Sequence, residues 1–186
     1  MPLSEDAFMH HVRSVSTNDE LLARLPDLCL PQCYLAAGCL FQPVWNHRSG
    51  NPSGWGINDF DVFYFDDTDT SYEAEDAVIQ RAARLFTDLD AKVEIRNQAR
   101  VHLWYGKKFG RPIAPLTSSK DGIEGFLVAC TCIGIEVETG AIHAPDGLQD
   151  LWNGILRPNP RTADDPLFLK KAESYKARWP WLRVDA

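Results

Sequence analysis

Long apolar runs are missing from this sequence. No window approaches the ~20 apolar residues that a bilayer-spanning helix needs, and the opening MPLSEDAFMHHVRSV has no apolar stretch of the kind found in secretion signals. We therefore expect a soluble cytoplasmic protein with no membrane partner. Disorder-prone low-complexity segments and internal repeats are also missing, which argues against a disordered chain or a repeat array.

An excess of basic residues is missing as well. The chain has 26 acidic and 19 basic residues, for a formal net charge of −7. Such a chain repels polyanions, so we expect no binding to long DNA or RNA. A local basic site for a small anion remains compatible with this charge, because salt screens distant charges beyond a Debye length of about 8 Å.

The cysteines lack the spacing of a zinc site or a disulfide framework. There are five, an odd number, at positions 29, 33, 39, 130 and 132, all in apolar surroundings. Cys29-x3-Cys33 and Cys130-x-Cys132 differ from the usual zinc spacings, and no histidine accompanies them. We predict reduced, buried thiols, with a zinc site as the weaker alternative.

What the chain does have is enough apolar sequence for one core. It is 186 residues long and 45% hydrophobic, and a domain of this size buries roughly 70% of its unfolded surface. We predict one domain over 1–186, with N-terminal helices in 1–28, a core in 30–160, and a C-terminal helix and tail in 161–186.

The order of predicted elements indicates an α+β chain. Ser4 caps a first helix through Phe8 and Val12, and a second helix over 18–25 ends at Pro26. Next we predict a strand ending near 36 that turns at 38 into a helix to about 47, a loop over 48–56 and a strand over 57–66. A helix with a capping box at Thr70 and Glu73 then runs to about 89, followed by a strand over 92–96 and a helix over 98–110. The last predicted elements are a short helix from 118 or 119 to 126, a hairpin over 127–143, a helix over 146–156 and a helix over 166–179.

Two aspartates in the strand over 57–66 predict a metal site. Residues i and i+2 of a strand lie on the same face about 6.6 Å apart, so Asp59 and Asp61 project side by side. Like charges this close destabilise a buried strand unless a cation lies between them, and Mg²⁺ prefers carboxylate oxygens. The alternative is a solvated strand face. Phe63 and Phe65 continue the same face, which favours the metal site.

The place of these acids along the strand separates three chemistries. Haloacid-dehalogenase-type phosphatases and D-x-D glycosyltransferases have an apolar strand before the acids, which emerge at its C-terminal end. Here the apolar residues follow Asp59 and Asp61. Upstream, the glycine turn at Gly38 opens a helix whose free N–H groups could hold a phosphate. A helix-opening glycine followed by an acid-x-acid strand is the order of the nucleotidyltransferase fold.

Several longer segments resemble one family more closely than the order of elements alone does. AAGCLFQPVWN, DFDVFYFD with TSYEAED, VEIRNQARVHLWYGKKFG, IHAPDGLQDLW and RPNP resemble the small stand-alone nucleotidyltransferase-like family, and the likeness covers roughly residues 30 to 180. The resemblance implies a nucleotidyltransferase-like α+β fold, a small mixed β-sheet flanked by helices, with a metal-nucleotide site.

The resemblance also implies roles for individual residues. Gly38 takes the place of the helix-opening glycine, and Cys39 stands where the wider fold prefers Gly or Ser, so a hydroxyl contact to phosphate is lost. Asp59 and Asp61 take the metal-binding positions. Glu94 takes the position of a third carboxylate on the neighbouring strand, and the alternative for Glu94 is an ordinary surface acid.

Arg96, Arg100 and His102 form a polar cluster close to the predicted site. A guanidinium can hold a triphosphate through two parallel hydrogen bonds, and this is the binding role we assign to Arg100. Alternatively, the motif ties a strand to its helix by hydrogen bonds. For His102 we expect a hydrogen-bonded core residue. Four tryptophans are expected to pack in the core and C-terminal region rather than stack on a base: Trp104, Trp152, Trp179 and Trp181.

The predicted function is transfer of a nucleoside monophosphate from an NTP such as ATP to an acceptor, with release of pyrophosphate. Mg²⁺ or Mn²⁺ is the expected cofactor, and the partners are the NTP and a small-molecule or protein acceptor. Two alternatives remain. One is a non-catalytic nucleotide-binding or regulatory module, which the cysteine at position 39 favours. The other is a metal-dependent phosphohydrolase or glycosyltransferase, which needs its acids at a strand end.

Overall fold

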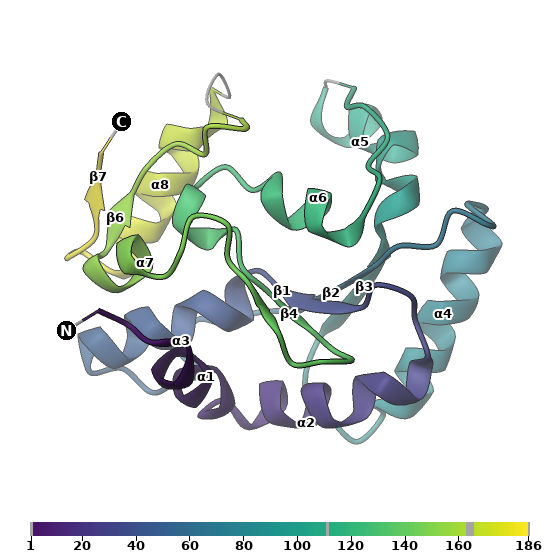
Figure 1. Cartoon of the computed structure of the whole chain (residues 1–186), viewed down its shortest axis with the longest axis horizontal. Coiled ribbons are helices and arrows are strands. Elements are labelled where there is room, and N and C mark those ends of the chain that lie inside the picture. Colours follow the sequence, from purple (N-terminus) through teal and green to yellow (C-terminus); the bar gives the residue numbers. More distant parts are fainter. Residues whose placement is uncertain (1, 111, 163–165, 186) are drawn as a thin grey trace.

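The protein is a mixed five-stranded sheet between two layers of helices, as predicted for the α+β class (Figure 1). This computed structural model describes residues 2–110, 112–162 and 166–185. The sheet order is β3-β2-β1-β4-β5, with β2 and β3 parallel and the other pairs antiparallel. The strands are β1 (Tyr34–Ala36), β2 (Phe60–Tyr64), β3 (Val93–Asn97), β4 (Gly134–Glu136) and β5 (Ile142–His143), and β6 (Ile155–Leu156) pairs in parallel with β7 (Arg183–Val184) apart from that sheet.

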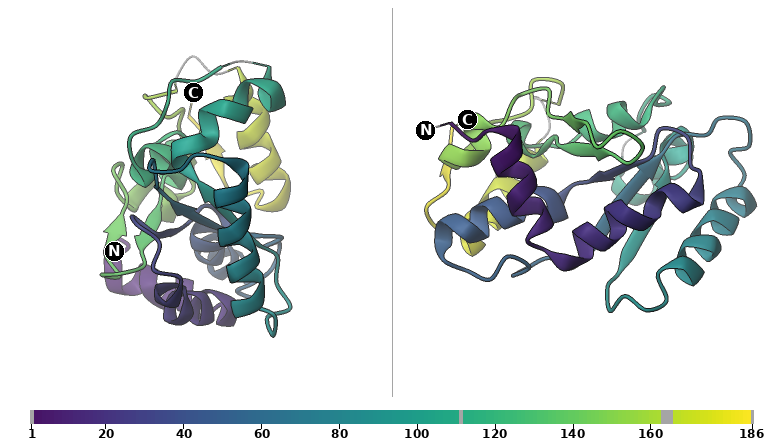
Figure 2. Two further views of the ribbon diagram at one scale, coloured as in Figure 1. Left: turned by 90° about the vertical axis from the view of Figure 1, so that its right-hand side faces the viewer. Right: turned by 60° about the horizontal axis from the view of Figure 1, so that its bottom comes forward.

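The helices divide between the two faces of the sheet (Figures 1 and 2). Below the sheet lie α1 (Glu5–Arg13), α2 (Ser16–Arg24) and α3 (Gly38–Ser49). Helix α4 (Tyr72–Leu85) flanks the sheet on the same side. Above it lie α5 (Val101–Phe109), α6 (Ser119–Glu124) and α8 (Leu167–Arg178), and α7 (Gln149–Asn153) precedes β6. Short 3-10 helices are η1 (Leu25–Leu28), η2 (Gln98–Arg100) and η3 (Ala129–Thr131). In the described part of the chain, every helix is too short or too polar to cross a membrane.

Alternation along β2 decides which face carries the core. Phe60, Val62 and Tyr64 are buried in the main core, whereas Asp61 and Phe63 are half-buried on the opposite face. That opposite, upper face is covered in part by α6. The candidate site residues therefore lie between the sheet and the upper helices.

Several predicted boundaries were wrong. The helix after β2 is capped by Ser71, whose hydroxyl accepts from the Ala74 N–H at 3.2 Å, and not by Thr70. Residues 127–133 form an irregular segment with η3 in place of a strand. The side-chain amide of Asn159 donates to the backbone carbonyls of residues 124 and 126 just before this segment, at 2.6 and 2.7 Å. The helix over 146–156 is only α7, because Gly154 ends it with a positive φ of 68°.

The thiols are free, as predicted, but not all are buried. Cys33, Cys39, Cys130 and Cys132 are buried, and Cys29 is exposed. Cys29 follows η1 with a left-handed φ of 50° and lies outside the core cluster.

Candidate active site

The parallel register of β2 and β3 brings two of the predicted acids together. Asp61 and Glu94 are partners in the ladder, so they share one face, and adjacent strands lie about 4.8 Å apart. Asp59 precedes the first residue of β2, so the pair of aspartates lies at the N-terminal end of this strand. The phosphohydrolase and glycosyltransferase alternative requires them at the C-terminal end. The observed position therefore counts against that alternative.

Asp61 sits in an environment that opposes its negative charge. Burial is the largest effect and raises its pKa to about 7, and repulsion from Asp59 and Glu94 acts in the same direction. The charges of Arg96 and Lys171 offset part of this rise. An aspartate that cannot easily ionise by itself, next to two other carboxylates, is a position that an added cation would stabilise.

Glu94 has partners of its own. Its carboxylate pairs with Lys92 and lies 3.7 Å from Arg96, and the hydrogen bond from Lys92 is the main reason why its pKa is lowered. Among the residues that the structure describes, no three His, Cys, Asp or Glu side chains come together as a ready metal site. Glu94 as the third carboxylate thus stays a prediction.

The turn at Gly38 lies beside the acids. Ala36 pairs with Asp61 in the antiparallel ladder, and α3 begins two residues later at Gly38. Between them, Ala37 has φ 63° and ψ −141°, a strained conformation for a residue with a side chain, and no side chain of the described residues caps the helix. A Cβ at Gly38 would come within 2.4 Å of Nε2 of Gln42, so glycine suits this position.

The side chain of Cys39 is buried and bonded to the end of β1. The thiol is fully buried and donates to the Ala36 carbonyl at 3.2 Å, and burial raises its pKa well above the ordinary value. A protonated thiol bonded in this way offers no contact to a phosphate. Any contribution of Cys39 to binding is therefore through its backbone N–H.

Helix α8 brings basic side chains that the sequence did not single out. Lys171, Tyr175 and Arg178 lie at i, i+4 and i+7, so they share one helix face. Nη1 of Arg178 donates to the Gly56 carbonyl at 3.2 Å and to Oε1 of Gln42 at 3.3 Å, which places it near the glycine turn.

Lys171 lies close enough to the aspartates for their charges to interact. Its side chain is exposed and its Nζ lies 5.1 Å from the ring centroid of Tyr175. Partial desolvation lowers its pKa, with the charge of Arg178 acting in the same direction, while Asp59 and Asp61 act against this. The i, i+4, i+7 spacing was visible in the sequence, but nothing local indicated which element this face would meet.

Arg100 is held by a buried ion pair. It bonds to Glu75, and its Nε donates to the Thr70 carbonyl at 3.1 Å. The other carboxylate oxygen of Glu75 accepts from the backbone N–H of Asn97 at 2.9 Å. These are the contacts of a side chain that ties β3 to α4. Contact between Arg100 and a triphosphate stays a prediction.

The predictions for His102 and the four tryptophans were right for some of these residues and wrong for others. Nδ1 of His102 is buried and has no hydrogen-bond partner among the described residues, so the expectation of a hydrogen-bonded core histidine was wrong for this nitrogen. Trp179 is fully buried, and Trp152 and Trp181 pack against the core, as expected. Trp104 differs, because it lines an open pocket.

Comparisons with known proteins show the family and the fold of this chain. A family model described as nucleotidyltransferase matches residues 23–184, and the chain belongs to this nucleotidyltransferase family. A solved NMR structure, described as revealing a CCA-adding enzyme head domain, superposes with a TM-score of 0.74 at 23% identity and covers 98% of this chain and 96% of its own. At this identity the likeness shows the fold. Among proteins with curated descriptions, none matches the chain significantly.

Proposed function

We propose that the protein transfers a nucleoside monophosphate from an NTP to an acceptor and releases pyrophosphate. The observation that carries this proposal is the meeting of Asp61 with Glu94 across β2 and β3, one strand away from the glycine turn. The family and the fold support the general chemistry of nucleotidyl transfer.

The residues fit a divalent cation held by Asp59 and Asp61. Mg²⁺ is commonly bound by one or two carboxylates together with substrate phosphates, so a preformed cage of three acids is not required. Burial and the neighbouring carboxylates raise the pKa of Asp61, so a cation bound there would stabilise its charged form. Bound there, Mg²⁺ or Mn²⁺ would orient the triphosphate and neutralise its developing charge.

The triphosphate would lie over the start of α3. Backbone N–H groups of Gly38 and Cys39 lie at the N-terminus of this twelve-residue helix, where the helix dipole favours an anion. Lys171 and Arg178 add positive charge from α8. We assign these four residues to the phosphates, and Arg100 to holding β3 and α4 in place.

In the proposed reaction, an acceptor oxygen attacks the α-phosphorus and the bond to the β-phosphate oxygen breaks. The acceptor proton leaves with a base, and pyrophosphate carries away the electron pair of the broken bond. Glu94 is the base in this scheme or completes the metal shell. To act as a base it must first give up its pair with Lys92.

The test is Asp61→Asn. We expect Mg²⁺-dependent pyrophosphate release, measured with ATP, CTP, GTP and UTP in turn and with water as the acceptor, to fall by at least about 100-fold. The neutral amide relieves the repulsion around position 61, so the variant should stay folded by circular dichroism. Asp67→Asn, at an exposed loop position, is the matched control and should keep full activity. Retained turnover in Asp61→Asn would remove this aspartate from the mechanism.

A non-catalytic nucleotide-binding module is the second candidate. Two observations favour it: the thiol of Cys39 is turned inward, and Glu94 is engaged by Lys92. Calorimetry with ATP or CTP and Mg²⁺, run beside the pyrophosphate assay, separates the two functions. Binding without pyrophosphate release for any of the four NTPs would favour the module.

A further inference from the structure

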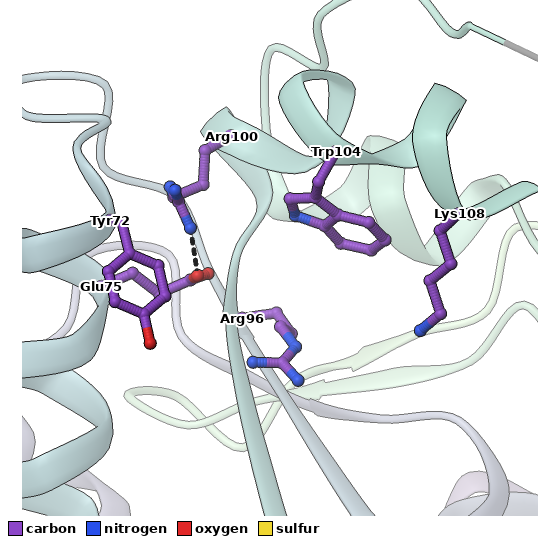
Figure 3. A pocket seen from close by; sticks show the side chains of 6 residues that line it. All are labelled: Tyr72, Glu75, Arg96, Arg100, Trp104 and Lys108. Carbon is purple, nitrogen blue, oxygen red and sulfur yellow. Dashed lines mark hydrogen bonds and ion pairs between the residues drawn. The ribbon is translucent and has the colours of Figure 1, made fainter.

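A pocket of about 280 Å³ opens at the edge of the sheet beside β3 (Figure 3). Its walls come from the start of α4, from β3, and from η2 with α5. They are lined by Tyr72, Glu75, Arg96, Arg100, Trp104 and Lys108. The two aromatic side chains lie on opposite walls, and three cations and one acid lie around them (Figure 3).

The pocket is basic in an acidic protein. Glu75 pairs with Arg100 through a buried ion pair, and Arg96 and Lys108 bring two further positive charges to the pocket. The side chain of Arg96 is 40% exposed, and Nζ of Lys108 lies 5.4 Å from the ring centroid of Trp104. Charged, partly exposed donors beside an aromatic surface suit a ligand that has both a phosphate and a planar ring.

The pocket adjoins the candidate active site through Glu94. Nη2 of Arg96 lies 3.7 Å from Oε2 of Glu94, and the charge of Lys108 also acts on Glu94. The pocket is therefore next to the carboxylate that the proposed reaction uses on the acceptor side.

The pocket lies on the side of Asp61 where in-line transfer requires the acceptor. The attacking and leaving oxygens lie on opposite sides of the phosphorus. In the proposed function, the leaving pyrophosphate rests on α3 and α8, beyond β1. The sheet order β1-β2-β3 puts the pocket on the other side of Asp61, and Figure 1 shows α8 and α5 on opposite sides above the sheet.

We propose that this pocket binds the acceptor, and that the acceptor is a phosphorylated small molecule with a planar ring, about the size of a mononucleotide. Arg96 and Lys108 bind its phosphate, and Trp104 stacks on its ring. This inference rests on the proposed function, because only that function calls for an acceptor. The net charge of −7 and the small volume favour a small molecule over the end of an RNA chain.

The first experiment measures binding of adenosine 5′-monophosphate to the full chain, without metal or NTP, by calorimetry and by NMR shifts of backbone amides. We expect shifts on α5 and at the start of α4, and weaker binding of ribose 5-phosphate, which lacks the ring. Lys108→Gln should weaken binding by about tenfold and Trp104→Ala by at least about fivefold. Lys107→Gln, on the same helix but outside the pocket, is the control and should bind normally. No shifts at this pocket up to millimolar ligand, or equal binding by Lys108→Gln and Lys107→Gln, would overturn the proposal.

The second experiment repeats the titration with Mg²⁺ and saturating α,β-methylene-ATP. Separate donor and acceptor sites predict that the monophosphate still binds with an affinity within about twofold. Competition between the two ligands, or loss of monophosphate binding in Lys171→Gln but not in Lys108→Gln, would place the monophosphate at the donor site and overturn the acceptor assignment. A single-stranded RNA oligomer that binds the pocket more tightly than the monophosphate would also overturn it, in favour of a nucleic-acid acceptor.

Failure of the proposed function gives a different result. In that case the protein releases no pyrophosphate from any of the four NTPs, whether or not the methylene analogue binds, whereas monophosphate binding at Trp104 and Lys108 persists. Failure of the acceptor inference alone leaves analogue binding and pyrophosphate release intact and shows no ligand in the pocket.

Discussion

At the scale of single residues, partners decide what each charge can do. Asp61 and Glu94 are both acids on the upper face, but burial raises the pKa of Asp61, whereas a hydrogen bond from Lys92 lowers that of Glu94. The two carboxylates therefore suit different tasks. Asp61 gains from a cation, and Glu94 already has one.

A second residue whose pKa is shifted lies far from the site and predicts a pH effect on stability. His11 is partly buried, with its ring centroid 4.5 Å from that of His47, and desolvation together with the nearby His47 and His10 lowers its pKa below 6.5. The folded protein therefore takes up this proton less readily than the unfolded chain. Its contribution to stability is complete above the unfolded pKa of about 6.5 and is lost as the pH falls below it.

The measurement is urea unfolding at about pH 7.5 and about pH 5.5. We expect the wild type to lose stability at the lower pH, and His11→Gln to lose less of it. His10→Gln removes only a smaller contribution to the shift of His11, and the side chain of His10 is exposed, so this variant should change the difference less than His11→Gln does. An unchanged difference between the two pH values in His11→Gln would contradict the prediction.

At the scale of elements, a polar clamp holds the ends of β2, β3 and α4 together. The side chain of Asn97 accepts from the Asp66 N–H at 3.1 Å and donates to the Asp66 carbonyl at 2.7 Å, which joins the end of β3 to the residues after β2. Glu75 of α4 bonds to the backbone N–H of Asn97 and to Arg100. This clamp fixes the parallel register that sets Asp61 beside Glu94.

Removing Glu75 tests the clamp. Glu75→Ala leaves the guanidinium of Arg100 buried without its acid, so we expect a loss of about 3–5 kcal/mol in the free energy of unfolding by urea. The double variant Glu75→Leu with Arg100→Met removes both charges and should recover much of this loss. Glu73→Ala, exposed on the same helix, should change stability by less than about 0.5 kcal/mol. A loss below about 1 kcal/mol in Glu75→Ala would contradict a structural role for the pair.

At the scale of the whole molecule, the acids lie between two basic regions, both above the sheet and one to either side of the acids. Lys171 and Arg178 come from α8, and Arg96 and Lys108 come from β3 and α5. The chain as a whole is acidic, so these regions attract small anions locally without making the surface a general polyanion binder.

Binding at the donor side should stabilise the whole fold. At a ligand concentration about 100 times its Kd, a nucleotide that binds only the folded protein adds about 2.7 kcal/mol, which raises Tm by about 5–11 °C for a chain of this size. We expect this rise with ATP plus Mg²⁺ and its loss on adding EDTA. Lys171→Gln should reduce the rise, whereas Lys170→Gln, one residue away on α8, should leave it unchanged. An EDTA-insensitive rise would contradict metal-assisted binding.

Much of the fold and part of the site could be predicted because their causes are local. The Ser4 cap, the strand that turns into α3 at Gly38 and the projection of Asp61 to the face opposite Phe60 follow from side-chain chemistry within a few residues. The exact start of α4 was missed because Thr70 and Ser71 are both good caps, and only the packed structure selects one.

The sequence by itself determined the α+β class, the alternation that directs Asp61 away from the core, and the acidity of the chain. Only the tertiary structure decided that Lys171, more than a hundred residues later in the chain, faces these aspartates, and that Lys92 binds Glu94. The physical reason is that strand and cap preferences act over a few bonds. Which distant surfaces meet depends instead on how all apolar faces are buried together, and this leaves no signal at the residues that meet.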